Sequence, residues 1–202
     1  MPGICPWDDA VVSALKASCM SVHTAKAPTT LTALLVRLMD TPGVPMHYPY
    51  HHFITPAALL TLAAMERGTG ADTLSAQLSL AEERARTVPG GFCGNCGACG
   101  AAIGAGIFVS VFTGGSPMSV ENWQWANEVT SLCLHKIASC PGPRCCKRVT
   151  FLAAQAAVPY LNEVCGLSLS LDEEISCHFH NKNPDCLERD CPFYPAQGGG
   201  VR

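Results

Sequence analysis

Three closely spaced cysteines at the head of an apolar run constrain the fold of this chain most. Cys93, Cys96 and Cys99 stand three positions apart on glycine-rich backbone, a spacing with which thiolates hold one face of an iron–sulfur cubane. Bacterial ferredoxins complete such a site with a remote cysteine followed by proline, and Cys140 and Cys191 are each followed by proline. We expect a 4Fe–4S cluster, with zinc or a buried, metal-free role as the alternatives.

The apolar run that follows, residues 98–113, predicts a helix with one flat face. Gly100 and Gly104 lie about one helical turn apart with alanines beside them, so another backbone can approach closely there. Because glycine costs about 1 kcal/mol relative to alanine inside a helix, these positions need a packing or site reason. A strand over residues 107–112 is the competing prediction, since β-branched and aromatic residues gather there.

The remaining sequence predicts helix after helix, with proline and glycine between them. Asp8 and Asp9 suit a helix N-terminus, and apolar residues then recur at three- and four-residue spacing. The same spacing places Cys19, and Cys133 of a later helix, in the core. The sequence therefore predicts a mainly α fold, a compact helical bundle in one domain (1–202) with a Cys/His-rich irregular C-terminal tail. The predicted helices cover residues 8–22, 31–38, 57–67, 74–85, 98–113, about 119–137 and the stretch ending at 165, and residues 1–43 form a helical N-terminal part.

Composition and charge exclude several classes of partner. The chain has 202 residues and a net charge of −3, so it lacks the basic face that nucleic acids and acidic membranes require. Its longest apolar run is shorter than the ~20 residues of a membrane span, and its start lacks the features of a signal peptide. For such a chain, 13 cysteines favour metal ligands or reactive thiols in a reducing cytoplasm over a disulfide framework.

A second cysteine cluster lies near the C-terminus. Cys177, Cys186 and Cys191 are candidate ligands of zinc or iron, with His178, His180 or a distant thiol as the fourth. The alternative is that this cluster only ties down a tail that would otherwise fray.

A third cluster combines two adjacent thiols with three basic residues. Cys145 and Cys146 open a predicted helix, where unpaired N–H groups and the helix dipole favour anions. Arg144, Lys147 and Arg148 add positive charge, so we expect a lowered thiol pKa and a catalytic cysteine here. The same geometry binds an anionic substrate or cofactor. The alternative is an ordinary solvated helix start.

Three histidines within six residues form a candidate acid–base or metal-binding group. His47, His51 and His52 are predicted to lie on a loop, because prolines interrupt this segment and the Thr-Pro pair at 55–56 is expected to begin the next helix. Imidazole titrates near physiological pH and is a common metal ligand, so either role is open. The alternative is that each histidine packs against its aromatic neighbours.

Four stretches together resemble a little-characterised cysteine-rich domain family of anaerobic bacteria and methanogenic archaea, sometimes fused to radical-SAM or methyltransferase domains. The resemblance covers roughly residues 44–195. The stretches are residues 45–53, 93–101, 142–148 and 177–195.

The resemblance implies an oxygen-sensitive setting and favours iron–sulfur chemistry. Members of the family do not always carry a cysteine that matches Cys96. The resemblance therefore leaves Cys93 and Cys99 in need of partners from the later clusters. It implies no particular reaction.

Together the clusters predict an iron–sulfur enzyme, either a lyase or an oxidoreductase. The cluster is held by Cys93 and Cys99 with Cys96 or a remote thiol. An open iron or the cationic thiol site then handles a small sulfur-containing or anionic substrate, or an electron or sulfur donor, while the histidines move protons. Desulfuration, elimination and thiol-based reduction all fit this arrangement. The alternatives are a non-enzymatic zinc or soft-metal binder and a thiol redox sensor.

Overall fold

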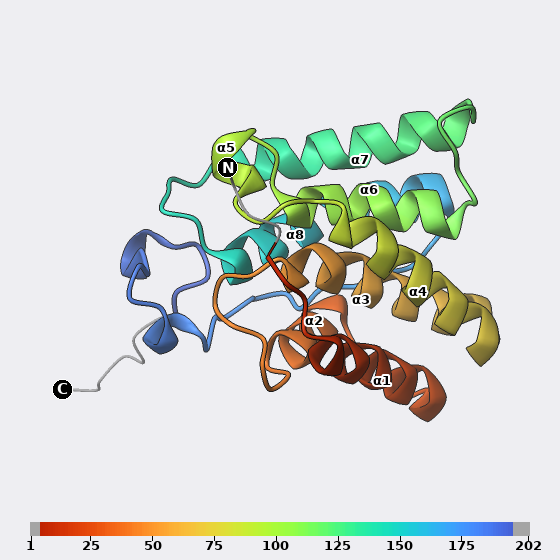
Figure 1. The fold of residues 1–202 in the computed structure, drawn as a ribbon, viewed down its shortest axis with the longest axis horizontal. Coiled ribbons are helices and arrows are strands. Elements are labelled where there is room, and N and C mark those ends of the chain that lie inside the picture. Colours follow the sequence, from red (N-terminus) through yellow and green to blue (C-terminus); the bar gives the residue numbers. More distant parts are fainter. Residues whose placement is uncertain (1–4, 196–202) are drawn as a thin grey trace.

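The computed structural model describes residues 5–195, and these residues form eight α-helices and two short 3-10 helices (Figure 1). They include no strand, so the predicted mainly α domain is confirmed and the alternative of a strand over 107–112 is wrong. The predicted domain limits at residues 1 and 202 lie outside the described residues. No helix between residues 5 and 195 has both the length and the apolar character needed to cross a membrane. The helices are α1 (Asp9–Ala25), α2 (Leu31–Met39), α3 (Tyr50–Arg67), α4 (Ala71–Arg86), α5 (Phe92–Asn95), α6 (Gly100–Phe112), α7 (Glu121–Ala138) and α8 (Cys146–Cys165), with 3-10 turns η1 (His180–Lys182) and η2 (Glu188–Asp190).

The first two helices begin where their side chains cap them. The Asp8 carboxylate accepts a hydrogen bond from the Ala10 N–H (2.8 Å), and the Thr30 hydroxyl accepts one from the Ala33 N–H (3.1 Å). Each bond satisfies an N–H group that the helix itself leaves unpaired.

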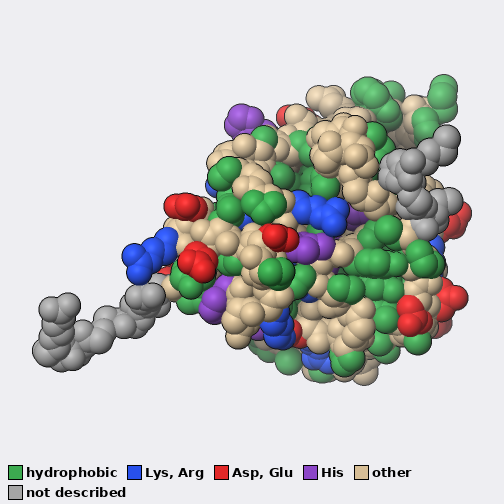
Figure 2. Space-filling model, turned by 60° about the vertical axis from the view of Figure 1, so that its left-hand side comes forward, with side chains coloured by type: hydrophobic (Ala, Val, Ile, Leu, Met, Phe, Trp, Pro, Cys, Tyr) green, Lys and Arg blue, Asp and Glu red, His purple; other side chains and the backbone are tan. Residues whose placement is uncertain are grey.

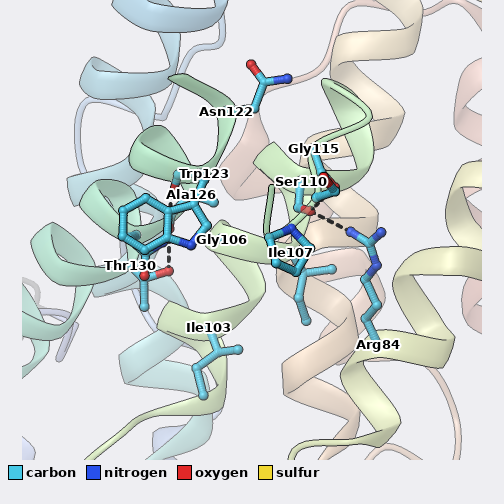
Figure 3. A pocket seen from close by; sticks show the side chains of 13 residues that line it. Arg84, Ile103, Gly106, Ile107, Ser110, Gly115, Asn122, Trp123, Ala126 and Thr130 are labelled. Atoms are coloured by element: carbon cyan, nitrogen blue, oxygen red, sulfur yellow. Dashed lines mark hydrogen bonds between the residues drawn. The ribbon is translucent and has the colours of Figure 1, made fainter. Parts of the chain in front are cut away.

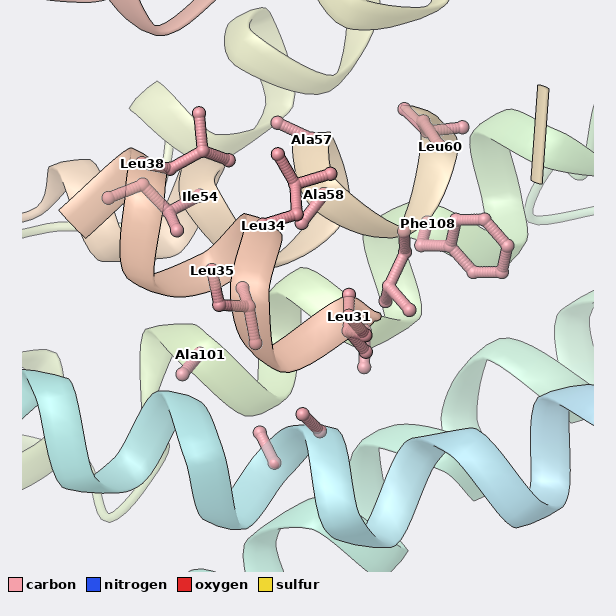
Figure 4. Packing of buried hydrophobic residues seen from close by; sticks show 14 of the residues in the cluster. Leu31, Leu34, Leu35, Leu38, Ile54, Ala57, Ala58, Leu60, Ala101 and Phe108 are labelled. Atoms are coloured by element: carbon pink, nitrogen blue, oxygen red, sulfur yellow. The ribbon is translucent and has the colours of Figure 1, made fainter. Parts of the chain in front are cut away.

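Helices α3 and α6 form the centre of the bundle. α3 contacts α1, α2, α4, α6 and α8, and α6 also contacts α4, α7 and α8. Figure 4 shows leucines of α2 beside Ile54, Ala57 and Ala58 of α3, with Ala101 and Phe108 of α6 nearby. The fully or almost fully buried leucines of α2 are Leu31, Leu34, Leu35 and Leu38.

The two cysteines predicted to lie in the core are buried, so that prediction is confirmed. The Cys133 thiol donates to the Ala153 carbonyl (3.3 Å). Burial raises the pKa of Cys19 to about 11 and that of Cys133 to about 12, which keeps both thiols protonated and unreactive.

The glycine face of α6 packs against α3, as its sequence predicts. A Cβ at Gly100 would overlap the His52 ring, and a Cβ at Gly104 would meet Pro56 Cδ at 2.8 Å and the His52 carbonyl oxygen at 2.9 Å. Glycine is therefore needed at these positions because the α3 backbone and its histidine occupy the space of a side chain.

The prediction of a loop at the histidines is wrong for two of them. α3 begins at Tyr50, so His51 and His52 lie in its first turn and Pro56 lies inside the helix. Pro56 removes the N–H that would bond the His52 carbonyl. The helix continues through it because Tyr50 and neighbouring apolar residues are buried, and this burial outweighs the local signal of a Thr-Pro pair.

Replacing Gly104 by alanine is expected to lower the free energy of unfolding by about 1–2 kcal/mol. Overpacking costs roughly 1–3 kcal/mol, and we expect the upper part of this range because a backbone oxygen and a proline ring cannot move aside easily; the better helix propensity of alanine returns about 1 kcal/mol. Urea denaturation measures the change. Gly94→Ala is the control, since a Cβ at Gly94 meets nothing within 4 Å. Equal stability of the two variants would contradict the close packing of α6 on α3.

One end of the bundle collects the residues predicted to carry chemistry. The N-terminal ends of α3, α6 and α8 all point to the left in Figure 1, where α5, the loop after α7 and the tail also lie. Residues 166–195 reach this end with no helix longer than three residues.

Candidate functional site

Four cysteines from separate segments line one cavity of about 590 Å³. Cys93 lies in α5, Cys99 caps α6, Cys140 follows α7 and Cys146 begins α8. We call this space the four-thiol cavity. It brings the predicted pair Cys93 and Cys99 together with two thiols from the later clusters.

The pKa values of these thiols are raised by burial and by the neighbouring thiols of the same cavity. Burial, and then the neighbouring Cys93, raises the pKa of Cys99. Burial followed by the neighbouring Cys99 raises the pKa of Cys146 to about 12, and Arg144 offsets only part of this. The sequence predicted a lowered pKa for Cys146. In the metal-free protein the shift is in the opposite direction, because desolvation outweighs the helix dipole and the nearby cations.

Two histidines of α3 also line the four-thiol cavity. The His51 ring, 1% exposed, donates from Nδ1 to the Tyr48 carbonyl (2.9 Å), and its Nε2 has no partner within the described residues. Because a carbonyl can only accept, the neutral ring carries its proton on Nδ1 and leaves a lone pair on Nε2. Burial lowers the pKa of His51 to about 3 and that of His52 to about 4, so both rings are neutral at physiological pH.

Arg148 places a buried positive charge at this site. Its side chain is 4% exposed and lines the cavity, and Nη2 donates to the carbonyls of Pro141 (2.9 Å) and Pro143 (2.6 Å). No carboxylate within residues 5–195 pairs with it. Since arginine stays charged and a buried unpaired charge is costly, this environment favours a negative group nearby.

A second set of four cysteines lines a much smaller space. Cys145, Cys177, Cys186 and Cys191 surround an enclosed pocket of about 10 Å³, which we call the tail pocket. Arg148 lines this pocket as well, so this residue borders both groups of thiols.

The adjacent thiols Cys145 and Cys146 are therefore not one site. Cys145 caps α8 and lines the tail pocket, whereas Cys146 lines the four-thiol cavity. Burial also raises the pKa of Cys145, and the bond from the Arg148 N–H to its sulfur (3.5 Å) offsets this only in part.

Several predicted residues lie outside the four-thiol cavity. Cys96 is exposed and does not line it. Lys147 is buried and donates to the Met39 carbonyl (2.8 Å), with its ammonium 4.8 Å from the centre of the Phe179 ring. Burial lowers the pKa of Lys147 to about 8. His47 lies between the two groups of thiols. Its Nε2 contacts Oδ1 of Asn183 (3.2 Å), which lines the tail pocket, and its Nδ1 accepts a hydrogen bond from the N–H of Cys146 (3.5 Å), which lines the four-thiol cavity.

The predicted site residues of the cationic cluster and the tail are thus divided between the two spaces. Arg144 is exposed and lines the four-thiol cavity. His178 pairs with Asp40 (2.6 Å), and His180 lines the tail pocket while its Nδ1 contacts the Cys177 carbonyl (2.9 Å).

The sequence offers Cys140 and Cys191 equally as the remote fourth ligand, because each precedes a proline. Only the fold shows that Cys140, and not Cys191, lines the cavity with Cys93 and Cys99. Among residues 5–195, no three His, Cys, Asp or Glu side chains converge closely enough to hold a single metal ion as they stand. All 13 cysteines lie in this part of the chain, and each is a free thiol.

A third cavity, of about 600 Å³, lies between α6 and α7 (Figure 3). It contains no cysteine or histidine. Its polar side chains are already paired: Arg84 donates to Ser110 (2.7 Å), Thr130 to the Ala126 carbonyl (2.8 Å) and Asn122 to the Thr113 carbonyl (3.2 Å). This groove therefore lacks the groups that the chemistry of metals or thiols requires.

The charged side chains on the face shown in Figure 2 are scattered, and lysine and arginine form no broad patch there. The electrostatic features of the site are accordingly local to the two groups of thiols.

Comparison with known proteins gives a family without a described function. The model of a family of unknown function (DUF5714) matches residues 16–194, a range that includes both the four-thiol cavity and the tail pocket. No curated protein and no solved structure matches the chain.

Proposed function

We propose that this chain, which belongs to the family DUF5714, is an iron–sulfur enzyme that holds a 4Fe–4S cluster in the four-thiol cavity and acts there on a small anionic or sulfur-containing molecule. The observation that carries the proposal is the meeting of Cys93, Cys99, Cys140 and Cys146 around one cavity. We place this function in a reducing, oxygen-poor cytoplasm, since all 13 thiols are free.

The size of the cavity favours a cluster over a single ion. A tetrahedral zinc ion draws four sulfurs to about 2.3 Å from one point, whereas each cysteine of a cubane binds a different iron and the sulfurs stay apart. The thiols here surround about 590 Å³ and do not converge on a point. That volume lies in the range of cavities that hold small ligands, so a molecule fits beside the cluster.

The charges around the cavity suit an anionic cluster. Four thiolates make a 4Fe–4S centre negative, and Arg144 and the buried Arg148 line the same space. The N-terminal ends of α3, α6 and α8 point toward this end of the molecule, and their dipoles add partial positive charge (Figure 1).

The remaining lining suits a small anion. Arg144 is exposed at the cavity and offers a guanidinium fork for a carboxylate or a phosphate. The lone pair on His51 Nε2 offers a hydrogen-bond acceptor or a metal ligand, and the Tyr48 carbonyl fixes the orientation of the ring as in many metal-bound histidines.

Two reactions fit this lining. In a reductase, a sulfur–sulfur bond of the substrate breaks and each sulfur takes up one electron and one proton; a cluster held by the cavity cysteines would supply the two electrons, one at a time, from a low-potential donor. In a lyase, a carbon gives its proton to a base, the neighbouring carbon–sulfur bond breaks with its electron pair going to sulfur, and a carbon–carbon double bond forms. Consumption of the donor distinguishes the two.

Anaerobic purification of the full chain, followed by iron and acid-labile sulfide assays and visible absorption spectroscopy, tests the proposal. We expect about four iron and four sulfide per chain and a brown protein. We also expect the spectrum of the reduced cluster to change when small anionic thiols or disulfides are added.

Two other outcomes would favour a different function. A colourless protein that carries zinc and unfolds on chelation would instead be a metal-stabilised binding module. Thiols that are lost reversibly under mild oxidant, with no bound metal, would indicate a redox sensor.

A further inference from the structure

The tail pocket carries a site of its own, separate from the proposed cluster. Cys177, Cys186 and Cys191 come from the tail, and Cys145 reaches them from the start of α8.

The volume of this pocket distinguishes its occupant from that of the four-thiol cavity. About 10 Å³ is close to the space of one water molecule, so the pocket admits a single ion and excludes a cubane. The rest of the lining is mainly apolar, with Phe179, Phe193 and Leu187 beside a few polar groups such as Asn183. Zinc is the metal that four cysteines in such a closed shell bind as a structural ion.

Backbone N–H groups already donate hydrogen bonds to two of these four sulfurs. The Arg148 N–H lies 3.5 Å from Cys145 Sγ, and the Glu188 N–H lies 3.3 Å from Cys186 Sγ. Arg148 lines the pocket and has no carboxylate partner in the described residues, so its positive charge can offset part of the negative charge of four thiolates.

The tail has little regular structure of its own. Between Gly166 and Tyr194 its longest helix has three residues, so buried side chains and contacts such as the edge-to-face pair of Phe151 and Phe193 (5.3 Å) hold it in place. Segments too small to build a core of their own are commonly held by a structural metal.

We propose that Cys145, Cys177, Cys186 and Cys191 bind one structural zinc ion that fastens the tail to the N-terminus of α8. The thiols do not converge on one point in the described residues, so binding requires them to move together. On this proposal Cys145 is a zinc ligand and not a catalytic nucleophile.

Zinc content of the full chain, purified in air without iron, tests this site independently of the cluster. We expect about one zinc per chain in the wild type and in Cys165→Ser, a half-buried thiol that lines neither space, and at least a tenfold loss in Cys186→Ser. Equal zinc in Cys186→Ser and wild type, or a wild type without zinc, would overturn the proposal whatever the four-thiol cavity holds.

Limited trypsin digestion of the wild type keeps the test valid if Cys186→Ser does not fold. Lys182 and Arg189 are exposed trypsin sites in the tail. We expect a chelator to speed cleavage at these sites about tenfold while residues 9–165 stay intact, and added zinc to restore protection. Tail cleavage at the same rate with and without chelator would contradict a zinc fastening.

Discussion

Replacing Cys140 by serine is expected to lower the iron content of the anaerobically purified protein at least tenfold, whereas replacing Cys96 by serine is expected to leave it unchanged. Cys140 lines the four-thiol cavity with Cys93, Cys99 and Cys146, so its loss removes one ligand of the proposed cluster. Changes to groups that merely orient a metal ligand already cost 10–100-fold in affinity. Cys96 belongs to the regular three-residue spacing but is exposed and outside the cavity.

Iron and sulfide assays on both variants, with circular dichroism to confirm that each is folded, measure this difference. The pair is closely matched, because each change replaces one sulfur by oxygen on a loop or at a helix end. Iron retained in Cys140→Ser and lost in Cys96→Ser would show that the sequence spacing, and not the cavity, defines the site.

Replacing Arg148 by methionine is expected to destabilise the metal-free protein by about 2–4 kcal/mol and to remove most of the bound metal. The side chain is 4% exposed, and it holds the loop that carries Cys140 through hydrogen bonds to Pro141 and Pro143. Hydrogen bonds to a charged group contribute about 1.5–3 kcal/mol each, and removing a buried charge returns part of that cost. Since Arg148 lines both groups of thiols, iron and zinc contents should fall together.

Urea denaturation of the metal-free protein and metal analysis of the loaded protein measure these effects. Arg144→Met is the control: that side chain is exposed, so stability should change by less than about 0.5 kcal/mol. Arg148→Lys should fall between the two, since one ammonium keeps the charge but loses the planar fork that reaches both carbonyls. Wild-type stability and metal content in Arg148→Met would contradict the role given to this residue.

Much of the fold follows from local patterns in the sequence. Apolar spacing places α1, α2, α4 and α7 within a few residues of their observed positions, and Gly100 and Gly104 predict the close approach of another helix. The start of α3 could not be predicted in this way. Its first turn is stabilised by burial of Tyr50 in the assembled bundle, which the Thr-Pro pair at 55–56 does not reveal.

The ligand groups could be predicted only in part, because tertiary geometry decides which thiols meet. Gly97 adopts a left-handed conformation (φ +70°) between Cys96 and Cys99, so equal spacing in the sequence does not place these thiols on one side. Adjacent positions diverge in the same way at the start of α8, where Cys145 and Cys146 line different spaces.

The prediction of a lowered thiol pKa at the start of α8 is wrong for an electrostatic reason. Helix dipoles and nearby cations are visible in a sequence, but the depth of burial is not. In the metal-free protein burial is the larger effect, and it raises the pKa of Cys146 to about 12. A bound metal replaces the proton on such a thiol, which reconciles a buried cysteine with a role as a ligand.

Alkylation of thiols in the anaerobically purified protein, read by mass spectrometry before and after the cluster is removed with an iron chelator and a thiol reductant, tests the central claim most directly. Cys93 and Cys140 are only half-buried, so in the absence of a cluster they should react, whereas burial raises the pKa of Cys99 and Cys146 and keeps these two thiols slow to react. We predict that Cys93 and Cys140 are protected together in the loaded protein and become reactive together once iron is lost, while Cys96 reacts in both states. Protection of Cys93 and Cys96 with Cys140 still reactive would contradict the account.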